Sequence, residues 1–381
     1  MDFKHVPVLY EECLEGLAIK PDGIYVDGTL GGAGHAFGIG SRLSEKGILI
    51  GIDRDKEAIK AAEKRLESLS CTKFLVQSTY DQIEDVLTQL QIDGIDGALL
   101  DIGVSSYQLD NGERGFSYMH DAPLDMRMNQ DDSFSAYDVV NGYDKKKLTE
   151  IIRKYGEERW ASRISDFIVK HRREEGDIKT TGELVDIIKA AIPASARREG
   201  PHPAKRTFQA IRIEVNSELE QLENAIDRFC DVLRPGGRLC IITFHSLEDR
   251  IVKEAFQRRL NPCTCPKEFP VCVCGKVTDV VKVTGKPIIS GEEELTENPR
   301  ARSAKTMIDP ERWYEYQRNY QKYGFDMKPK PEPEPAPTKR TRQRKTVKVP
   351  FPLASGKKMA FSGVVAIGVI MIMLIIVTAY A

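Results

Sequence analysis

The sequence predicts an α/β fold in which a parallel sheet is covered by helices on both faces. Strand-like and helix-like segments alternate over the first hundred residues, and the same alternation returns near residue 209. The segment between them is mostly polar and has helical periodicity. We therefore expect one α/β domain, formed by residues 1–103 and 209–326, with a helical domain of residues 104–208 inserted into it.

Four strands are predicted in the first part, each a short apolar run with turn residues beside it. They read "GIYVDGTL", "ILIGIDRD", "TKFLVQ" and "GIDGALLDIG". The intervening helices read "HAFGIGSRLSEKG", which we expect to end at Gly47, "DKEAIKAAEKRLESL" and "YDQIEDVLTQL". In the second helix Ile59, Ala62, Leu66 and Leu69 form one apolar stripe, which favours packing against a sheet.

The same patterns predict the helices and strands of the insert and of the second part of the α/β domain. The clearest helices of the insert are "KKKLTEIIRKYGEERWASRISDFIVKHRRE" and "TTGELVDIIKAAI". A helix "ELEQLENAIDRFCDVL", a turn "RPGG", an apolar strand "RLCIITFH" and a helix "SLEDRIVKEAFQRRL" restore the α/β pattern. Segments with β-type composition come last, "VTDVVKVTGKPII" and "ARSAKTMI".

Composition limits the class of protein without assigning a function. The chain has 381 residues, of which 41% are hydrophobic and 30% charged, with a formal net charge of −1. This balance is typical of a globular protein and gives no overall preference for nucleic acid, so any basic surface is local. The first residues, "MDFKHVPVLYEECL", lack the long apolar core of an export signal. We expect a cytoplasmic protein with reduced cysteines.

The last part of the chain changes character. Residues 327–358 read as a Pro-rich basic linker, with eight Lys or Arg between positions 339 and 358. Residues 359–381 carry no charge, and as a helix they would span roughly 35 Å at 1.5 Å per residue. They predict a transmembrane helix, with a buried core helix as the alternative. The basic residues before it predict anchoring at the inner face of the cell membrane.

The glycine-rich stretch "YVDGTLGGAGH" after the first strand predicts a ligand loop, with an unliganded tight turn as the alternative. A dinucleotide and S-adenosyl-L-methionine are the competing ligands. Phe37 stands where a dinucleotide loop has its third glycine, and no GK[ST] follows. A carboxylate at Asp27 would repel a pyrophosphate and attract a sulfonium or ammonium group, which favours S-adenosyl-L-methionine over a nicotinamide cofactor.

Three further residues follow strands of the same sheet. Asp53 ends the second strand, where a carboxylate accepts hydrogen bonds from ribose hydroxyls in either cofactor class. A helix N-cap is the alternative reading, and it suits Asp55 better. Tyr80 follows the third strand, either against an adenine or in the core. Asp101 ends the fourth strand at the edge where the cofactor crevice is expected.

Nine motifs in order resemble one family, the bacterial 16S rRNA cytosine-N4 methyltransferases that act on cytosine 1402 of the decoding centre. They are "HVPVLYEECLEGL", "DGTLGGAGH", "GIDRD", "LLDIGVSSYQLD", "RGFSY", "PLDMRM", "RTFQAIRIEVNSEL", "LRPGGRLCIITFHSLEDRIVK" and "NPRARSAK". The resemblance covers roughly residues 1–325. It implies a class I Rossmann-like methyltransferase domain with an inserted helical substrate-recognition domain, S-adenosyl-L-methionine as cofactor, and 16S rRNA or the small ribosomal subunit as partner.

The resemblance also implies a set of cofactor contacts: Ala33, Gly34, His35, Asp53, Tyr80, Asp101 and Gln108. A homodimer is a further assembly to consider. After Pro329 the chain departs from the family and resembles the start of a small single-pass cell-division protein. A membrane-tethered scaffold without catalysis is therefore a rival function, and a nicotinamide-dependent enzyme is a weaker one.

The chemistry that the resemblance implies needs an acceptor for the amino protons of cytosine. Asp101, or a backbone carbonyl near it, is the candidate, and the target base must be extruded to reach the methyl group. His245, in "FHSLED" after the fifth strand, is a second catalytic candidate; a helix-entry role is its alternative.

Two clusters remain. We expect RNA phosphates to be bound by a basic stretch near the end of the insert, at Arg197, Arg198, Lys205, Arg206 and Arg212. On charge alone a solvated polar loop is the alternative. The stretch "CTCPKEFPVCVC" offers four thiolates for a zinc ion, at Cys263, Cys265, Cys272 and Cys274. Its C-x-C spacing differs from the usual C-x-x-C, so free reduced thiols are the alternative.

Overall fold

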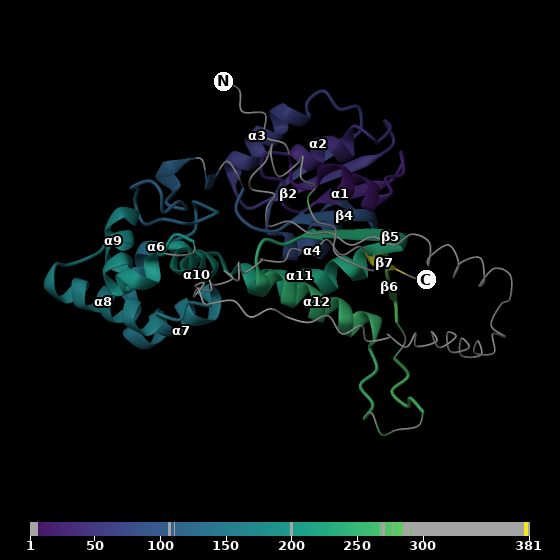
Figure 1. Ribbon diagram of the computed structural model, residues 1–381. Coiled ribbons are helices and arrows are strands. Elements are labelled where there is room, and N and C mark those ends of the chain that lie inside the picture. Colours follow the sequence, from purple (N-terminus) through teal and green to yellow (C-terminus); the bar gives the residue numbers. More distant parts are fainter. Residues whose placement is uncertain are drawn as a thin grey trace, which may run out of the picture. The chain divides into compact units, whose positions relative to one another are not determined.

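The structure is a computed structural model, and its central feature is a sheet whose first five strands in sequence are parallel (Figure 1). The strand order is β3-β2-β1-β4-β5-β7-β6, with β7 antiparallel to both neighbours. The described residues are 7–105, 108–109, 111–198, 201–266, 268, 271–276, 278–284 and 290, with the backbone of Val377–Ala379. The strands are β1 (Ile24–Asp27), β2 (Ile48–Asp53), β3 (Thr72–Gln77), β4 (Ile95–Asp101), β5 (Leu233–Ile242), β6 (Val280–Lys282) and β7 (Val377–Ala379).

Helices cover both faces of this sheet, which confirms the predicted α/β class. One face packs on the apolar sides of three helices through side chains such as Leu14, Ile39 and Leu66. The other face packs on three more helices through Val86, Phe229 and others. These helices are α1 (Tyr10–Leu17), α2 (Gly34–Gly40) and α3 (Lys56–Leu66) on the first face, and α4 (Ile83–Leu90), α11 (Glu218–Val232) and α12 (Ser246–Leu260) on the second.

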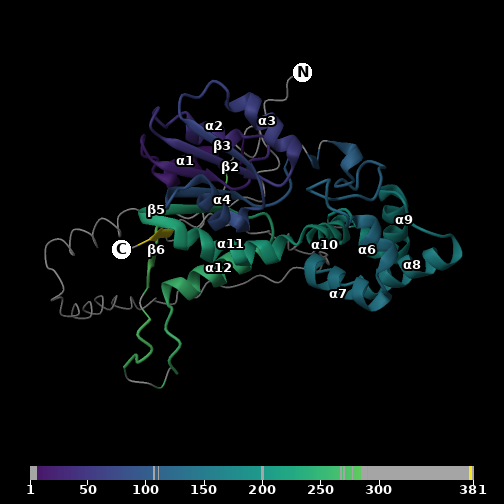
Figure 2. The same cartoon turned by 180° about the vertical axis from the view of Figure 1, so that it is seen from behind.

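The insert between β4 and α11 has an apolar core of its own. Leu148, Ile152, Ile164 and Leu184 are all fully buried in it. Figure 2 shows its helices gathered beside α10. They are α6 (Ala136–Gly142), α7 (Lys145–Gly156), α8 (Ala161–Glu174), α9 (Thr181–Ala191) and α10 (Lys205–Asn216). The insert also has the short 3₁₀ turns η2 (Gly112–Arg114) and η3 (Ala194–Arg197), and another, η1 (Tyr80–Gln82), follows β3. The domain boundaries stay predictions, and the one at residue 208 falls inside α10.

Two helix boundaries differ from the expectation. The helix α2 ends at Gly40 and not at Gly47, because two glycines in its last turn weaken it and the chain turns at Ser41. The long helical stretch of the insert is two helices. Glu157 has a left-handed backbone, with φ of 48°, so α7 ends there and α8 starts anew.

The C-terminal predictions fall mostly outside the described residues. That applies to the basic linker 327–358, to "ARSAKTMI" and to residues 359–376 of the predicted membrane helix. Val377–Ala379 form strand β7, so the helix prediction is wrong for these three residues; Val and Thr are β-branched and favour extended backbone. In the part of the chain that is described, no helix is long and apolar enough to cross a membrane.

Candidate functional site

A cavity of about 640 Å³ opens at the carboxyl ends of the strands. The strand order reverses direction between β1 and β4, which is where open α/β sheets bind ligands. Loops after β1, β2, β3, β4 and β5 contribute to its wall, together with α10. The lining includes these predicted site residues: Gly34, His35, Asp53, Tyr80, Asp101, Gln108, Lys205, Arg212 and His245.

Asp27 does not line this cavity, contrary to the prediction. Its side chain is only 1% exposed, and its Oδ1 accepts a hydrogen bond from Thr29 N at 3.1 Å. Burial, and then the charge of Asp53, raises the pKa of the Asp27 carboxyl to about 7. The reason is register: Asp27 pairs with Gly51 and Leu99, so β1 ends two residues short of Asp53 and Asp101.

Asp53 fixes the glycine loop against the end of β2. Its Oδ2 accepts from Gly31 N at 2.8 Å, and its Oδ1 accepts from Asp55 N at 2.9 Å. Gly31 has φ of 46°, a left-handed conformation that suits glycine. Burial raises the pKa of Asp53. Asp55 caps α3 by accepting from Glu57 N at 3.0 Å, which confirms the N-cap reading of Asp55.

Asp101 has the most unusual surroundings in the cavity wall. Its backbone N–H donates to Thr29 Oγ1 at 2.6 Å, which holds the end of β4 against the loop. Burial, followed by the charges of Asp27 and Glu248, raises its pKa to about 8. Its Oδ1 is buried and has no hydrogen-bond partner among the described residues. A buried acceptor without a partner is costly, so this oxygen is suited to accept a hydrogen bond from a ligand.

His35 lies beside Asp101 in the first turn of α2. Its Nε2 is 3.1 Å from Val8 O, and a carbonyl only accepts, so Nε2 carries a proton. The other ring nitrogen, Nδ1, is 3.7 Å from Asp101 Oδ2, beyond hydrogen-bond distance. Gly34 also lines the cavity. Ala33 does not; it is the left-handed N-cap of α2 and sets where the helix begins.

His245 combines the two roles that the sequence left open. It is the N-cap of α12, where its Nδ1 accepts from Glu248 N at 3.4 Å, and it also lines the cavity. Glu248 Oε2 accepts in return from Phe244 N at 2.6 Å. Burial works to raise the pKa of Glu248, but His245 and these hydrogen bonds hold it below its usual value. The pair closes the β5 side of the cavity.

Tyr80 and Gln108 complete the predicted cofactor set. Tyr80 starts η1, and its hydroxyl lies 3.5 Å from Glu218 O; burial raises the pKa of its phenol. Gln108 is buried and holds its amide between two partners. Its Nε2 donates to Asp55 Oδ2 at 3.1 Å, and its Oε1 accepts from Ser105 N at 3.2 Å.

The five predicted RNA contacts differ in their surroundings. Lys205 and Arg212 line the cavity, whereas Arg197, Arg198 and Arg206 are exposed. Arg212 forms two hydrogen bonds of 2.8 Å with the carboxylate of Glu218. Burial works to lower its pKa, but Glu218 raises it, so Arg212 is charged and already neutralised. Arg206 donates to the backbone carbonyl of Glu157 at 3.0 Å.

Several residues that line the cavity were not predicted from the sequence. Thr29 and Arg54 adjoin predicted residues, and Arg54 stands in "GIDRD" directly after Asp53. Tyr118, from "RGFSY", lines the insert side of the cavity. Its ring stacks on His202, with centroids 4.7 Å apart and planes 9° apart. An aromatic residue in a polar, glycine-rich segment was the signal that could have marked Tyr118.

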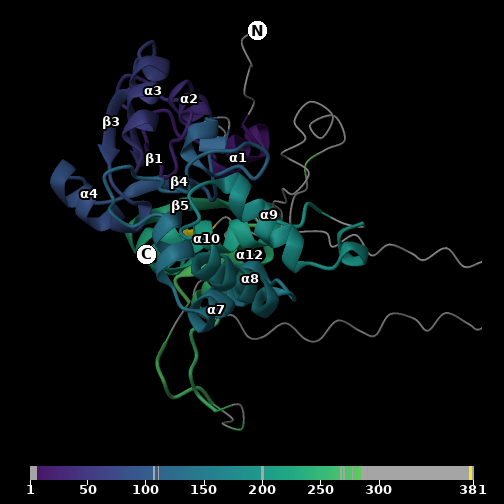
Figure 3. The same ribbon diagram turned by 90° about the vertical axis from the view of Figure 1, so that its left-hand side faces the viewer.

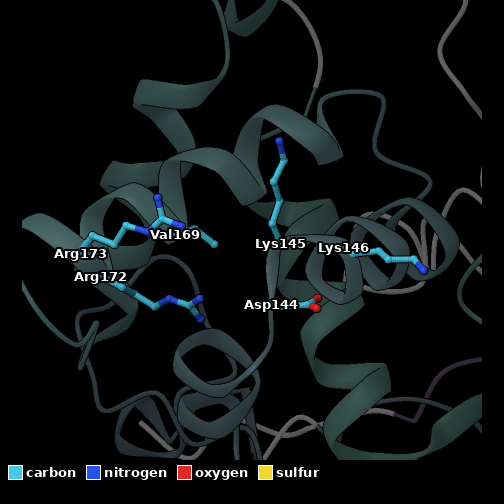
Figure 4. A pocket seen from close by; sticks show the side chains of 6 residues that line it. All are labelled: Asp144, Lys145, Lys146, Val169, Arg172 and Arg173. Atoms are coloured by element: carbon cyan, nitrogen blue, oxygen red, sulfur yellow. The ribbon is translucent and has the colours of Figure 1, made fainter.

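A second hollow, of about 420 Å³, lies on the insert and holds several cations (Figure 4). Two of the four cations, Lys145 and Arg172, are already engaged. Lys145 pairs with Asp166 at 2.5 Å, and Arg172 donates to the carbonyls of Val140 and Tyr143 at 2.8 Å. Figure 4 shows Lys146 pointing away from the arginines. These contacts join α6, α7 and α8, and none of the strand-end carboxylates is near them.

The parallel sheet, the crevice at its switch point and the carboxylates after β2 and β4 define a class I Rossmann-like methyltransferase fold. A family model for the MraW methylase family matches residues 2–309, and the chain belongs to this family. S-adenosyl-L-methionine is therefore its cofactor, as predicted. The cavity suits such a group: Asp101 offers a buried acceptor, and Asp53 adds a second carboxylate at the strand ends.

Known proteins resemble the chain to different degrees. Ribosomal RNA small subunit methyltransferase H of Ruminiclostridium cellulolyticum is 57% identical over 310 residues, covering 81% of this chain and 99% of that protein. An rRNA methylase structure from Streptococcus thermophilus aligns with a TM-score of 0.34 and 10% identity, over 76% of this chain and 92% of that one. A Streptococcus mutans methyltransferase structure in complex with SAH aligns with a TM-score of 0.33 and 12% identity, over the same shares.

Proposed function

We propose that this chain transfers a methyl group from S-adenosyl-L-methionine to the exocyclic N4 of cytosine 1402 in 16S rRNA of the small ribosomal subunit. The name of the Ruminiclostridium relative supports ribosomal RNA of the small subunit as the substrate. The motifs of the family support the cytosine and its position. The observation that carries the chemistry is the buried, unpartnered Oδ1 of Asp101 in the cavity wall. We place the activity in the cytoplasm, where ribosomal subunits are found.

Asp101 is the proposed acceptor of the cytosine amino group. The N4 lone pair is delocalised into the ring, so N4 attacks poorly unless an acceptor hydrogen-bonds its protons and orients it. The cofactor supplies the methyl group, bound to a positively charged sulfur. Beside a positive charge the raised pKa of Asp101 falls, which favours the carboxylate form. Asp101 then takes up the proton that N4 loses and passes it to solvent, while Thr29 holds its backbone in place.

The cofactor would be held by Gly34, His35, Asp53, Tyr80 and Gln108. Each oxygen of Asp53 accepts one backbone N–H and keeps lone-pair capacity for ribose hydroxyls. Tyr80 lines the cavity after β3, at the expected place for an adenine. Ala33 would act indirectly, by setting the start of α2. His245 would act as a positioning residue through its cap on α12, and not as a proton acceptor.

The target base would enter from the side of the insert. Tyr118 offers an aromatic ring at the cavity, of the kind on which extruded bases stack. Lys205 offers a cation in the same wall, and the exposed Arg197, Arg198 and Arg206 would bind phosphates farther out. We assign Arg212 a different role, because Glu218 already occupies its guanidinium.

Methyl transfer from tritiated cofactor to small ribosomal subunits tests the proposal. We expect Asp101→Asn to lower kcat, measured at saturating cofactor, by on the order of 10²–10³-fold. Asp85→Asn, at an exposed position on α4, is the control and should keep full activity. A rate for Asp101→Asn within about threefold of wild type would remove Asp101 from the mechanism.

The site of modification needs a separate measurement. Mass spectrometry of 16S rRNA from cells lacking this gene should show loss of one methyl group from N4 of cytosine 1402. Loss from another base, with that cytosine unchanged, would refute the assignment of the substrate but not the methylase chemistry. The membrane tether and the homodimer stay predictions.

A further inference from the structure

Four cysteines meet on two arms of chain that lie side by side between α12 and β6 (Figures 1 and 3). Cys263 and Cys265 are on the arm that leaves α12, and Cys272 and Cys274 are on the arm that leads to β6. A backbone contact joins the arms as well, because Val273 N donates to Cys265 Sγ at 3.3 Å. The arrangement lies away from the carboxyl-end cavity and plays no part in the proposed function.

The sulfur atoms have the spacing of ligands to one metal ion. The Sγ–Sγ distances are 3.4 Å for Cys263–Cys272, 3.9 Å for Cys265–Cys272, 3.3 Å for Cys272–Cys274 and 3.8 Å for Cys274–Cys263. All four atoms lie within 4.8 Å of one another. A disulfide would bring two of them to about 2.05 Å. A tetrahedron with Zn–S bonds of about 2.3 Å has edges of about 3.8 Å.

We propose that these four thiolates bind one structural zinc ion. Because extended backbone alternates its side chains, C-x-C places both thiols of an arm on the same side. Two such arms that face each other supply the four corners of a tetrahedral site. A C-x-x-C turn is therefore not required. Tetrahedral thiolate sites hold zinc or iron–sulfur clusters. A single ion fits better, since the thiolates of a cluster bind different iron atoms and stand farther apart.

Where the structure describes them, the arms have no apolar core that would hold them together. Among the described residues of 261–276 none is buried, and the largest apolar side chains, Val271 and Val273, are 70% and 72% exposed. Further polar contacts lie at the base of the arms, where Arg259 binds Asp231 at 2.6 Å and also pairs with Asp279. A segment that buries no apolar surface cannot offset the entropy of ordering it, so a metal cross-link at the tip supplies what the core does not.

Metal analysis of the full chain, purified with reductant and supplied with zinc, tests this proposal. We expect about one zinc per chain in the wild type, and less than about 0.1 in the double variant Cys272→Ser, Cys274→Ser. Thr264→Ala, exposed between two proposed ligands, is the matched control and should keep one zinc. Cobalt substituted for zinc should give the visible spectrum of a tetrahedral tetrathiolate site in the wild type and the control only.

Thiol reactivity gives a second readout that does not depend on methyl transfer. In the zinc-loaded protein the four cysteines should react slowly with an alkylating reagent, and a chelator should make them fast. Zinc content below about 0.1 in the wild type, or equal reactivity with and without chelator, would overturn the proposal. A disulfide between any two of the four in the reduced, zinc-supplied protein would overturn it as well. Failure here leaves the proposed methylation untouched, since the two sites share no residue.

Discussion

Replacing Arg114 with methionine should be among the most destabilising single changes in this fold. The side chain of Arg114 is 3% exposed and lies at the start of the insert. Its Nη1 donates to Asp55 Oδ2 at 2.9 Å, and its Nη2 donates to the carbonyls of Arg127 and Met128 at 2.9 and 3.0 Å. The same Asp55 oxygen accepts from Gln108, so Arg114 connects the insert, the N-terminus of α3 and the cavity wall.

The size of the effect follows from what Arg114→Met leaves behind. Methionine keeps much of the length but leaves a buried carboxylate without its cation and two carbonyls without donors. Breaking a buried ion pair from one side costs about 3–5 kcal/mol, largely because the other charge stays buried. Removing that charge as well, in Arg114→Met with Asp55→Asn, should restore about 1–3 kcal/mol. Arg65→Met is the control: Arg65 is exposed and, among the described residues, donates to Gly32 O alone, so its loss should cost less than about 1 kcal/mol.

Urea unfolding with linear extrapolation measures these differences, and an unchanged m-value shows that the same surface unfolds. Cofactor affinity is a second readout, because Gln108 depends on Asp55, and Asp55 on Arg114; we expect a weaker Kd for Arg114→Met. A stability loss below about 1 kcal/mol at constant m would refute the reasoning. So would a double variant no more stable than Arg114→Met, because the penalty would then not come from the stranded Asp55 charge.

Three other predictions concern charge. The pKa of Asp27 is raised to about 7, so between pH 4 and 7 the folded state holds a proton that the unfolded state releases. Wild-type stability relative to Asp27→Asn should therefore fall across that range, by up to about 4 kcal/mol in urea unfolding at stepped pH, and a constant difference would contradict this. For methyl transfer, kcat/KM for the cofactor should rise with pH and level off above about 8, because Asp101 of the cofactor-free protein must ionise, whereas Asp101→Asn should have a low, flat profile. In filter-binding assays Arg197→Ala with Arg198→Ala should reduce the slope of log K against log salt by about 1–2, while Arg212→Ala should mainly lower stability.

Much of the fold could be predicted because its elements carry their own signals. The strand "TKFLVQ" and the helix "SLEDRIVKEAFQRRL" have the bounds of β3 and α12, since turn residues and a capping residue mark their ends. The end of α2 was missed because glycines inside the segment, and not the one after it, stop the helix. The break between α7 and α8 depends on the left-handed backbone of Glu157. Glutamate rarely has a positive φ, so the residue type does not predict a helix end there.

Site residues could be predicted where they only need to end a parallel strand. Those whose position depends on how the strands pair in register could not. Asp53 and Asp101 each end a strand, so both reach the same edge of the sheet whatever the pairing in detail. Asp27 also ends a strand, and nothing local distinguishes it from them. Its depth depends on β1 stopping level with Gly51 and Leu99, which is a property of the assembled sheet. The stacking partner of Tyr118, His202, likewise comes from a segment that only folding brings near, whereas Glu218 lies just six residues after Arg212, across the break between α10 and α11.

Asp27 does not line the cavity, yet its charge still bears on which ligand the cavity favours. The register of β1 explains how. Two residues of strand amount to roughly 6.6 Å, so Asp27 lies below Asp53 and Asp101 in the sheet. The charge of Asp53 raises the pKa of Asp27, and the charge of Asp27 raises that of Asp101. Three carboxyl groups on neighbouring strands thus oppose one another's ionisation. A positively charged sulfur at the cavity would relieve that opposition, while a pyrophosphate would add to it, so we expect Asp27 to favour the cationic ligand through Asp101 and not by contact.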